Sequence, residues 1–176
     1  PLYSSAASDV YKRQLIERYS TIGGVCLNVG CIPSKALLHT AKVITDAEDT
    51  SSHGVTFSKP EINLEELRDW KSNKVVKKLT MGLSQMAKQR AVNIVEGIGK
   101  FVTPNQISVI DQDGSKKTIQ FQSAIIAAGS QPTKIPNTPD DDRIMDSTGA
   151  LELNDIPDKL LIICLLYTSP SPRDVE

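Results

Sequence analysis

Residues 23–35, which read GGVCLNVGCIPSK, decide how the rest of the chain is interpreted. Cys26 and Cys31 lie in this stretch, between glycines and a predicted helix start. Pro33 suits the first turn of a helix, and apolar residues recur at spacings of three and four in the run that follows. Cys31 is therefore expected near a helix N-terminus, where the helix dipole stabilises a thiolate.

Cys26 lies about one helical turn before Cys31, which is close enough for a disulfide if the local backbone permits it. A bridge that closes so short a loop adds little stability, because the entropic benefit of a cross-link grows with the length of the loop. A disulfide between Cys26 and Cys31 therefore makes better sense as chemistry than as a structural link.

The stretch from Gly23 to Leu38 resembles the redox-disulfide motif of the class I pyridine nucleotide-disulfide oxidoreductases, and the resemblance extends from about residue 15 to residue 163. Within that family it is most similar to the members that oxidise dihydrolipoamide to lipoamide with NAD⁺. Glutathione and mercuric reductases share the two cysteines and their spacing, and they are the alternative. The resemblance implies a redox-active disulfide in which Cys26 exchanges with the sulfur of the substrate and Cys31 contacts the flavin.

The resemblance also assigns residues to FAD, with NAD as the second cofactor and no metal. Glu17 corresponds to the glutamate that holds the adenosine ribose, since a carboxylate at the carboxyl end of a parallel strand can accept from both hydroxyls. Lys35 would approach the flavin and stabilise its reduced, anionic form. The full expected cofactor site is Glu17, Arg18, Tyr19, Ser20, Thr21, Ile22, Gly23, Gly24, Val25, Cys26, Lys35, Gly99, Ala128, Gly129 and Ser130.

The order of elements indicates an α/β fold, and the resemblance implies part of an FAD-binding, Rossmann-like domain with a three-layer ββα character. Residues 46–58 are polar and turn-like, and residues 64–90 indicate a long helix or a helix pair. Residues 91–102 follow a strand pattern, and two alternating segments around Asp113 predict a small β-hairpin region. The apolar run 124–128 is expected to form a buried strand that enters a tight turn.

The chain is expected to be an internal fragment of a longer enzyme, inactive by itself. Residues 15–150 would be a partial FAD-binding domain, and residues 151–163 a connector with the first strand of a truncated NAD-binding domain. Residues 1–14 and 164–176 look non-native, so Cys164 should take no part in the chemistry. No glycine precedes Glu17, although the family places a glycine-rich phosphate-binding turn roughly 20 residues earlier.

Composition sets the remaining limits. The 176 residues are 39% hydrophobic with a net charge of −1, so no nucleic-acid or membrane partner is indicated. Three cysteines favour a cytoplasmic protein with one catalytic pair over a secreted disulfide framework. The resemblance implies a homodimer that serves the lipoyl domains of 2-oxo acid dehydrogenase complexes or of the glycine cleavage system. Two alternatives stay open: a zinc site that combines the cysteines with a histidine, and a structural disulfide in a binding module.

Overall fold

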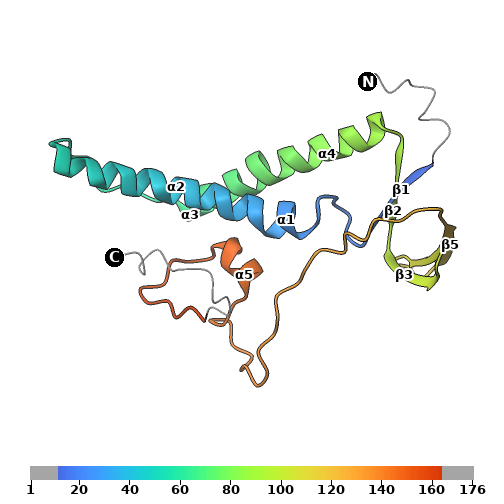
Figure 1. Cartoon of the computed structure of the whole chain (residues 1–176). Coiled ribbons are helices and arrows are strands. Elements are labelled where there is room, and N and C mark those ends of the chain that lie inside the picture. Colours follow the sequence, from blue (N-terminus) through green and yellow to red (C-terminus); the bar gives the residue numbers. More distant parts are fainter. Residues whose placement is uncertain (1–11, 164–176) are drawn as a thin grey trace.

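The computed structural model describes residues 12–163, and its helices and strands occupy two regions (Figure 1). Long helices lie on one side, and short strands lie on the other. The elements in order are β1 (Arg13–Glu17), α1 (Gly24–Val29), α2 (Cys31–Asp49), the 3-10 turn η2 (Thr50–His53), α3 (Leu64–Asp69), the π-helical segment η3 (Trp70–Val76), α4 (Lys77–Gln89), β2 (Val92–Glu96), β3 (Ile98–Thr103), β4 (Gln106–Ile110), β5 (Lys116–Gln120) and α5 (Ser147–Glu152).

The strands form two small sheets. β1 and β2 pair in parallel, with Glu17 opposite Glu96, and the helices α1 to α4 connect them. β3, β4 and β5 form an antiparallel sheet in that order, which confirms the predicted hairpin region. A Cβ at Gly99 in β3 would lie 3.3 Å from Ile16 in β1, so the antiparallel sheet packs against the parallel pair. Helices, a parallel sheet and an antiparallel sheet together confirm the α/β, ββα class.

The helical side follows the predicted pattern with one change. α2 begins at Cys31, as predicted, but continues to Asp49 through residues that the sequence indicated as turn-like. An ion pair between Lys42 and Asp46, at 2.7 Å and one turn apart, supports this extension. Segments α3, η3 and α4 run without a break from residue 64 to residue 89, which confirms the predicted long helix.

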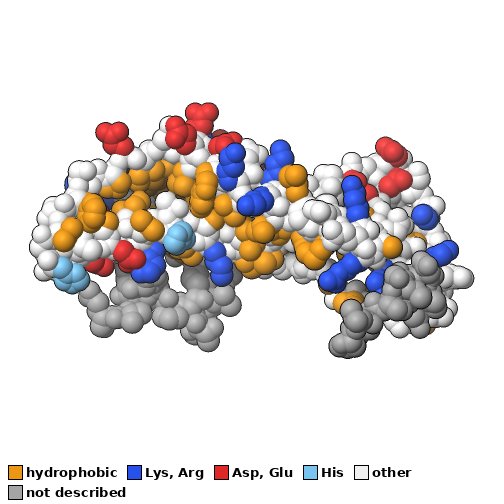
Figure 2. Space-filling view, turned by 90° about the horizontal axis from the view of Figure 1, so that it is seen from above, with side chains coloured by type: hydrophobic (Ala, Val, Ile, Leu, Met, Phe, Trp, Pro, Cys, Tyr) orange, Lys and Arg blue, Asp and Glu red, His pale blue; other side chains and the backbone are white. Residues whose placement is uncertain are grey.

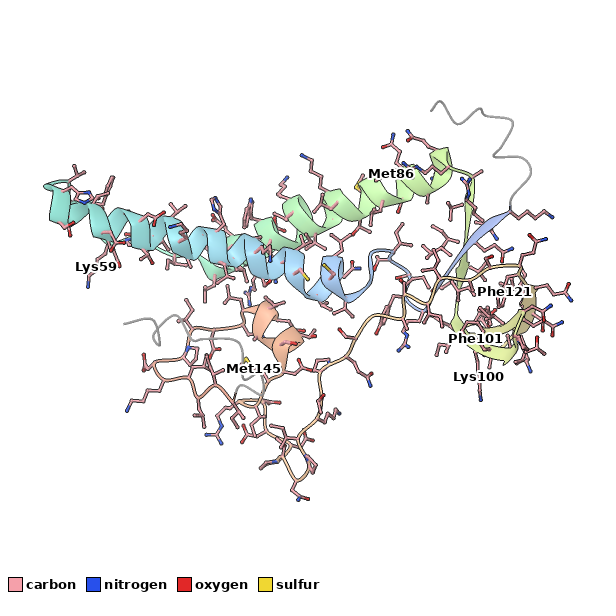
Figure 3. All side chains as sticks on the ribbon, in the orientation of Figure 1. Lys59, Met86, Lys100, Phe101, Phe121 and Met145 are labelled. Carbon is pink, nitrogen blue, oxygen red and sulfur yellow. The ribbon has the colours of Figure 1, made fainter. Side chains whose placement is uncertain are left out.

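The buried apolar core of the described residues is small. It consists of Ile22, Leu27, Val109 and Ile119. The rings of Phe101 and Phe121 meet edge to face with centroids 5.9 Å apart (Figure 3), but Phe101 is exposed, so this pair lies outside the buried core. Apolar side chains also form an exposed band along the helical region (Figure 2).

The prediction of a buried strand over residues 124–128 is wrong. These residues form no strand, and Ile125 and Ile126 are 95% and 75% exposed. A continuous apolar run becomes a strand when a parallel sheet covers both of its faces, and the parallel sheet of the described residues contains only β1 and β2. For the same reason the strand expected within residues 151–163 is not formed, and Leu161 is exposed.

The segments expected to be non-native lie mostly outside the described residues. Residues 1–11 and 164–176, with Cys164, are not described. Inside the described part, β1 already begins at Arg13, two residues before the expected start of the FAD-binding domain.

Candidate redox site

The structure places the two motif cysteines on consecutive helices. Cys26 lies in α1, Cys31 is the first residue of α2, and both are exposed free thiols. Their side chains are close enough to interact by hydrogen bonding. Because both cysteines are free thiols in this structure, the expected disulfide between them stays a prediction.

Gly30 separates the two helices and allows their close approach. A Cβ at this position would lie 2.9 Å from the carbonyl oxygen of Val25 and 3.3 Å from the Cα of Cys26. Any larger residue would push α2 away from α1, because backbone atoms cannot move aside as a flexible side chain can. The glycine between the cysteines therefore has a physical role in bringing Cys26 and Cys31 together.

The environment of Cys26 raises the pKa of its thiol. The largest cause is the hydrogen bond with the side chain of Cys31, and partial desolvation and the charge of a Cys31 thiolate act in the same direction. The ammonium group of Lys35 opposes them and lowers the pKa of Cys26. Lys35, although exposed, therefore lies near enough to the pair for its charge to act on it.

Glu17, for which a ribose contact stays a prediction, lies at the end of a strand. It ends β1 at the carboxyl edge of the parallel pair, where ligands of such sheets bind. Its carboxylate accepts a hydrogen bond from the backbone N–H of Tyr19 at 3.2 Å. The remaining lone pairs of the carboxylate can accept hydrogen bonds from two adjacent hydroxyl groups, such as those of the ribose of FAD. Residues 18–25 then lead from this strand directly to Cys26.

The other expected cofactor residues divide into two groups. Gly129 has a φ of 73° and would place a Cβ 3.9 Å from the side chain of Val25, which brings residues 128–130 to the redox helix. Gly99 does not lie against an open space: its missing Cβ points at Ile16 and Ile107, both at 3.3 Å. Packing of β3 on β1 explains why residue 99 is a glycine, and the geometry gives no support to a flavin contact there.

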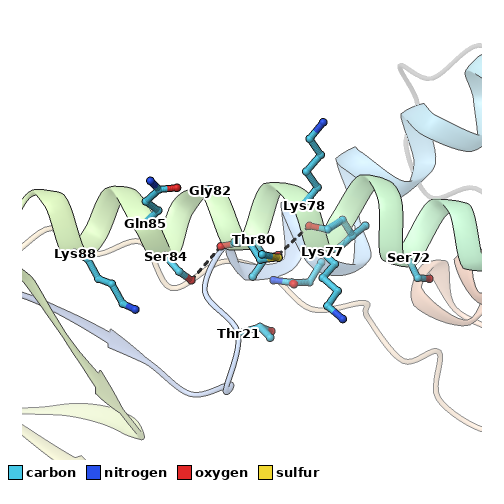
Figure 4. A pocket seen from close by; sticks show the side chains of 12 residues that line it. Thr21, Ser72, Lys77, Lys78, Thr80, Gly82, Ser84, Gln85 and Lys88 are labelled. Atoms are coloured by element: carbon cyan, nitrogen blue, oxygen red, sulfur yellow. Dashed lines mark hydrogen bonds between the residues drawn. The ribbon is translucent and has the colours of Figure 1, made fainter.

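An open groove adjoins the redox motif between the loop after β1 and helix α4 (Figure 4). Thr21 and Asn28 line it from the motif side, and Lys77, Thr80 and Ser84 line it from the helical side. The hydroxyls of Thr80 and Ser84 donate to the carbonyls of Val76 and Thr80, at 3.1 and 3.0 Å, within their own helix. Cys26 and Cys31 are not among the residues that line this groove.

Sequence reasoning did not single out Asn28, whose side-chain amide donates to the carbonyls of Ile22 and Gly24 at the start of α1. Its signal was available, because asparagine is a poor helix former and lies next to the last residue of so short a helix. Within residues 12–163, no three His, Cys, Asp or Glu side chains gather as a metal site. In the same range, no helix has both the length and the apolar character that crossing a membrane requires.

The chain belongs to the pyridine nucleotide-disulphide oxidoreductase family, whose model matches residues 4–163. Members of this family are oxidoreductases that use FAD and NAD. The chain is similar to the dihydrolipoyl dehydrogenases of Vibrio parahaemolyticus and Vibrio cholerae, each 55% identical over 150 residues. Those matches cover 85% of this chain and 31% of either relative.

Two further comparisons agree with this placement. The dihydrolipoyl dehydrogenase of Staphylococcus aureus is 42% identical over 157 residues, which is 89% of this chain and 33% of the relative. The crystal structure of LpdA from Mycobacterium tuberculosis is 18% identical with a TM-score of 0.73, and the match covers 88% of this chain and 34% of that one. This likeness concerns the fold. The chain thus spans about a third of the length of the curated relatives it matches.

Proposed function

We propose that this chain provides the redox-active disulfide and part of the FAD site of a dihydrolipoyl dehydrogenase. The observation that carries the proposal is the pair of exposed thiols, Cys26 and Cys31, held within hydrogen-bonding reach on consecutive helices. The membership of the chain in this family and its sequence identity to dihydrolipoyl dehydrogenases favour this function over a zinc site or a structural disulfide.

In the proposed reaction, one thiolate of dihydrolipoamide attacks Sγ of Cys26 and breaks the Cys26–Cys31 bond, which leaves Cys31 as a thiolate. The second substrate thiol then attacks the mixed disulfide, so that lipoamide leaves with its own disulfide and Cys26 is freed. The substrate loses two electrons and the protein disulfide gains them. Its raised pKa keeps the released Cys26 protonated at neutral pH.

FAD, when bound, passes these two electrons on to NAD⁺. Glu17 would hold the ribose of FAD, the backbone of residues 18–25 would line it, and residues 128–130 would approach it beside Val25. Lys35 would place its positive charge near the reduced flavin, as it already acts on Cys26. The same proposal assigns residues 15–150 to part of an FAD-binding domain. It assigns residues 151–163 to a connector and the beginning of an NAD-binding domain.

The partners and location follow from the same function. The complete enzyme would act as a homodimer on the lipoyl domains of 2-oxo acid dehydrogenase complexes or of the glycine cleavage system, in the cytoplasm. The relatives' name supports a lipoyl substrate.

A chimera tests this proposal. Residues 15–163 replace the corresponding part of the Vibrio cholerae relative, and the purified protein is assayed for FAD content and for NAD⁺ reduction by dihydrolipoamide. We expect a flavoprotein with turnover that Cys26→Ser and Cys31→Ser each abolish, because a single thiol cannot store two electrons as a disulfide. His39→Ala, an exposed change on α2, is the control and should leave turnover unchanged.

The chimera also separates the alternatives. Full turnover by either cysteine variant would overturn the redox role of the pair. Preference for glutathione disulfide or mercuric ion would assign the segment to another branch of the family. Zinc bound by a protein without flavin absorbance would favour a metal site.

A further inference from the structure

Asn28 lies between the two cysteines in sequence. Its side chain donates to the first residue of α1 and to the loop that precedes α1. Its Nδ2 donates to the carbonyl oxygen of Gly24 at 2.9 Å and to that of Ile22 at 3.4 Å. Both bonds are partly buried, and Ile22 itself is buried. The bond to Ile22 joins α1 to the loop that enters it, and the bond to Gly24 lies within the helix, at its first residue.

Helix α1 needs such support because it is very short. It has six residues, and its N-cap residue, Gly23, makes no side-chain capping bond. Helices of this length are not stable by themselves in water, so tertiary and side-chain contacts fix their direction. Besides Asn28, the buried side chain of Leu27 anchors the helix.

The position of Asn28 on α1 leaves Cys26 free to face its partner. Two residues along an α-helix correspond to a rotation of about 200°, so Asn28 and Cys26 project from nearly opposite sides. Asn28 therefore holds one side of the helix to the loop, while Cys26 on the other side stays exposed and interacts with Cys31.

We propose that Asn28 is a positioning residue of the redox pair: by bonding to Gly24 at the start of α1 and to Ile22 in the loop before it, it holds the Cys26 thiol toward Cys31. This inference rests on the proposed redox role of the two cysteines. Asn28 takes no part in the chemistry itself, and its effect passes through the orientation of α1.

Two substitutions of Asn28 distinguish the effects of its two side-chain hydrogen bonds. In Asn28→Ala both carbonyls lose the side-chain donor, and the loop residue Ile22 loses its side-chain link to α1, so that α1 can turn or fray. In Asn28→Ser the shorter hydroxyl can still donate to the carbonyl four residues earlier, which is that of Gly24, but it cannot reach Ile22. The serine variant should therefore show a smaller effect of the same sign.

The test measures how readily the Cys26–Cys31 disulfide forms in the purified 176-residue chain carrying Cys164→Ser. The protein is equilibrated with mixtures of reduced and oxidised glutathione, and the fraction with an internal disulfide is determined by alkylation and mass mapping. We expect Asn28→Ala to lower the equilibrium constant about tenfold, which corresponds to ~30 mV in the reduction potential of the pair. Asn28→Ser should lower it about threefold.

Thr40→Ala is the matched control, because Thr40 makes the same kind of side-chain bond to the carbonyl of Ala36 within α2. It should change stability without changing the disulfide equilibrium. As a second readout, the pH midpoint of Cys26 alkylation should fall toward that of an ordinary cysteine in Asn28→Ala, because the Cys26 thiol is no longer held beside Cys31.

Each outcome is informative. A wild-type chain that forms no Cys26–Cys31 disulfide contradicts the proposed function. A wild-type chain that forms it, with an unchanged equilibrium constant in the asparagine variants, overturns the role of Asn28 alone. If Asn28→Ala lacks the wild-type circular dichroism spectrum, Asn28→Ser decides the question, and an equilibrium constant equal to that of the wild type rejects the proposal.

Discussion

At the scale of single residues, the chemistry of the site depends on how three side chains act on one another. Cys31 raises the pKa of the Cys26 thiol through a hydrogen bond, and the positive charge of Lys35 lowers it. These opposite effects come from residues four positions apart on the first turns of α2. The reactivity of Cys26 is therefore adjusted mainly by its neighbours, and partial desolvation acts in the same direction as Cys31.

This balance can be measured from the pH dependence of Cys26 alkylation by iodoacetamide, followed by peptide mass mapping. Cys31→Ala removes the largest cause of the raised pKa, so the alkylation midpoint should move to lower pH. Lys35→Met removes the charge that stabilises the thiolate, so the midpoint should move to higher pH. Lys42→Met, on the same helix and paired with Asp46, is the control. Shifts of the opposite sign would contradict the described geometry.

At the scale of elements, the π-helical segment η3 changes which residues of the long helix face inward. A π-helical turn contains more residues than an α-helical turn, so it breaks the 3.6-residue period of the long helix. On a regular 3.6-residue period, Lys71 is predicted to lie opposite the apolar face and to be exposed to solvent. That prediction is wrong, because Lys71 is only 8% exposed. Its ammonium group donates to the carbonyl oxygen of Leu151, which ties α5 to η3.

The buried lysine should give the chain a characteristic dependence of stability on pH. Desolvation lowers the pKa of Lys71, and Arg68 acts in the same direction, while the carboxylate of Glu152 opposes both. A lowered lysine pKa means that the unfolded chain binds more protons, so the penalty is full below the folded pKa and is relieved as the pH rises from there to the ordinary value.

Urea unfolding from pH 7 into the alkaline range tests this expectation. The free energy of unfolding of the wild type should rise relative to that of Lys71→Met as the pH increases. Lys74→Met, an exposed change in the same segment, should run parallel to the wild type throughout. A difference between wild type and Lys71→Met that stays constant with pH would show that the charge of Lys71 is not desolvated.

At the scale of the whole molecule, burial is concentrated at a few places. Val109, in the middle strand of the antiparallel sheet, is 2% exposed, whereas the apolar run 124–128 lies open to solvent. The hydrophobic effect rewards only the surface that is removed from water. Residues of similar chemistry should therefore contribute very differently to stability.

Two substitutions compare these regions by chemical denaturation. Val109→Ala should lower the free energy of unfolding by about 2 kcal/mol, because it removes buried methyl groups and leaves a cavity. Ile125→Asn should change it by no more than about 0.5 kcal/mol, as at an ordinary surface position. A large loss in Ile125→Asn would mean that the run is buried in solution.

The sequence alone determined the features that depend on neighbouring residues. The start of the helix at Cys31 and the hairpin around Asp113 follow from local spacing and turn chemistry, whereas the strand that ends at Glu17 was implied by the family resemblance. Local rules suffice there because backbone geometry fixes which side chains within a few positions can meet. The start of α2 and the end of β1 were predictable for that reason, while the roles of Glu17 and Lys35 toward FAD stay predictions.

Only the tertiary structure decided what depends on contacts between distant segments. It gave Gly99 a packing role against Ile16, buried Lys71 beneath α5, and left residues 124–128 without the neighbours that a buried strand requires. Burial is a property of the whole arrangement, because the type of a residue does not by itself decide whether distant segments of the chain cover it. The amide of Asn28 is an intermediate case: helix geometry brings the carbonyl of Gly24 within its reach, but only the bend of the chain before α1 brings that of Ile22 to the same donor.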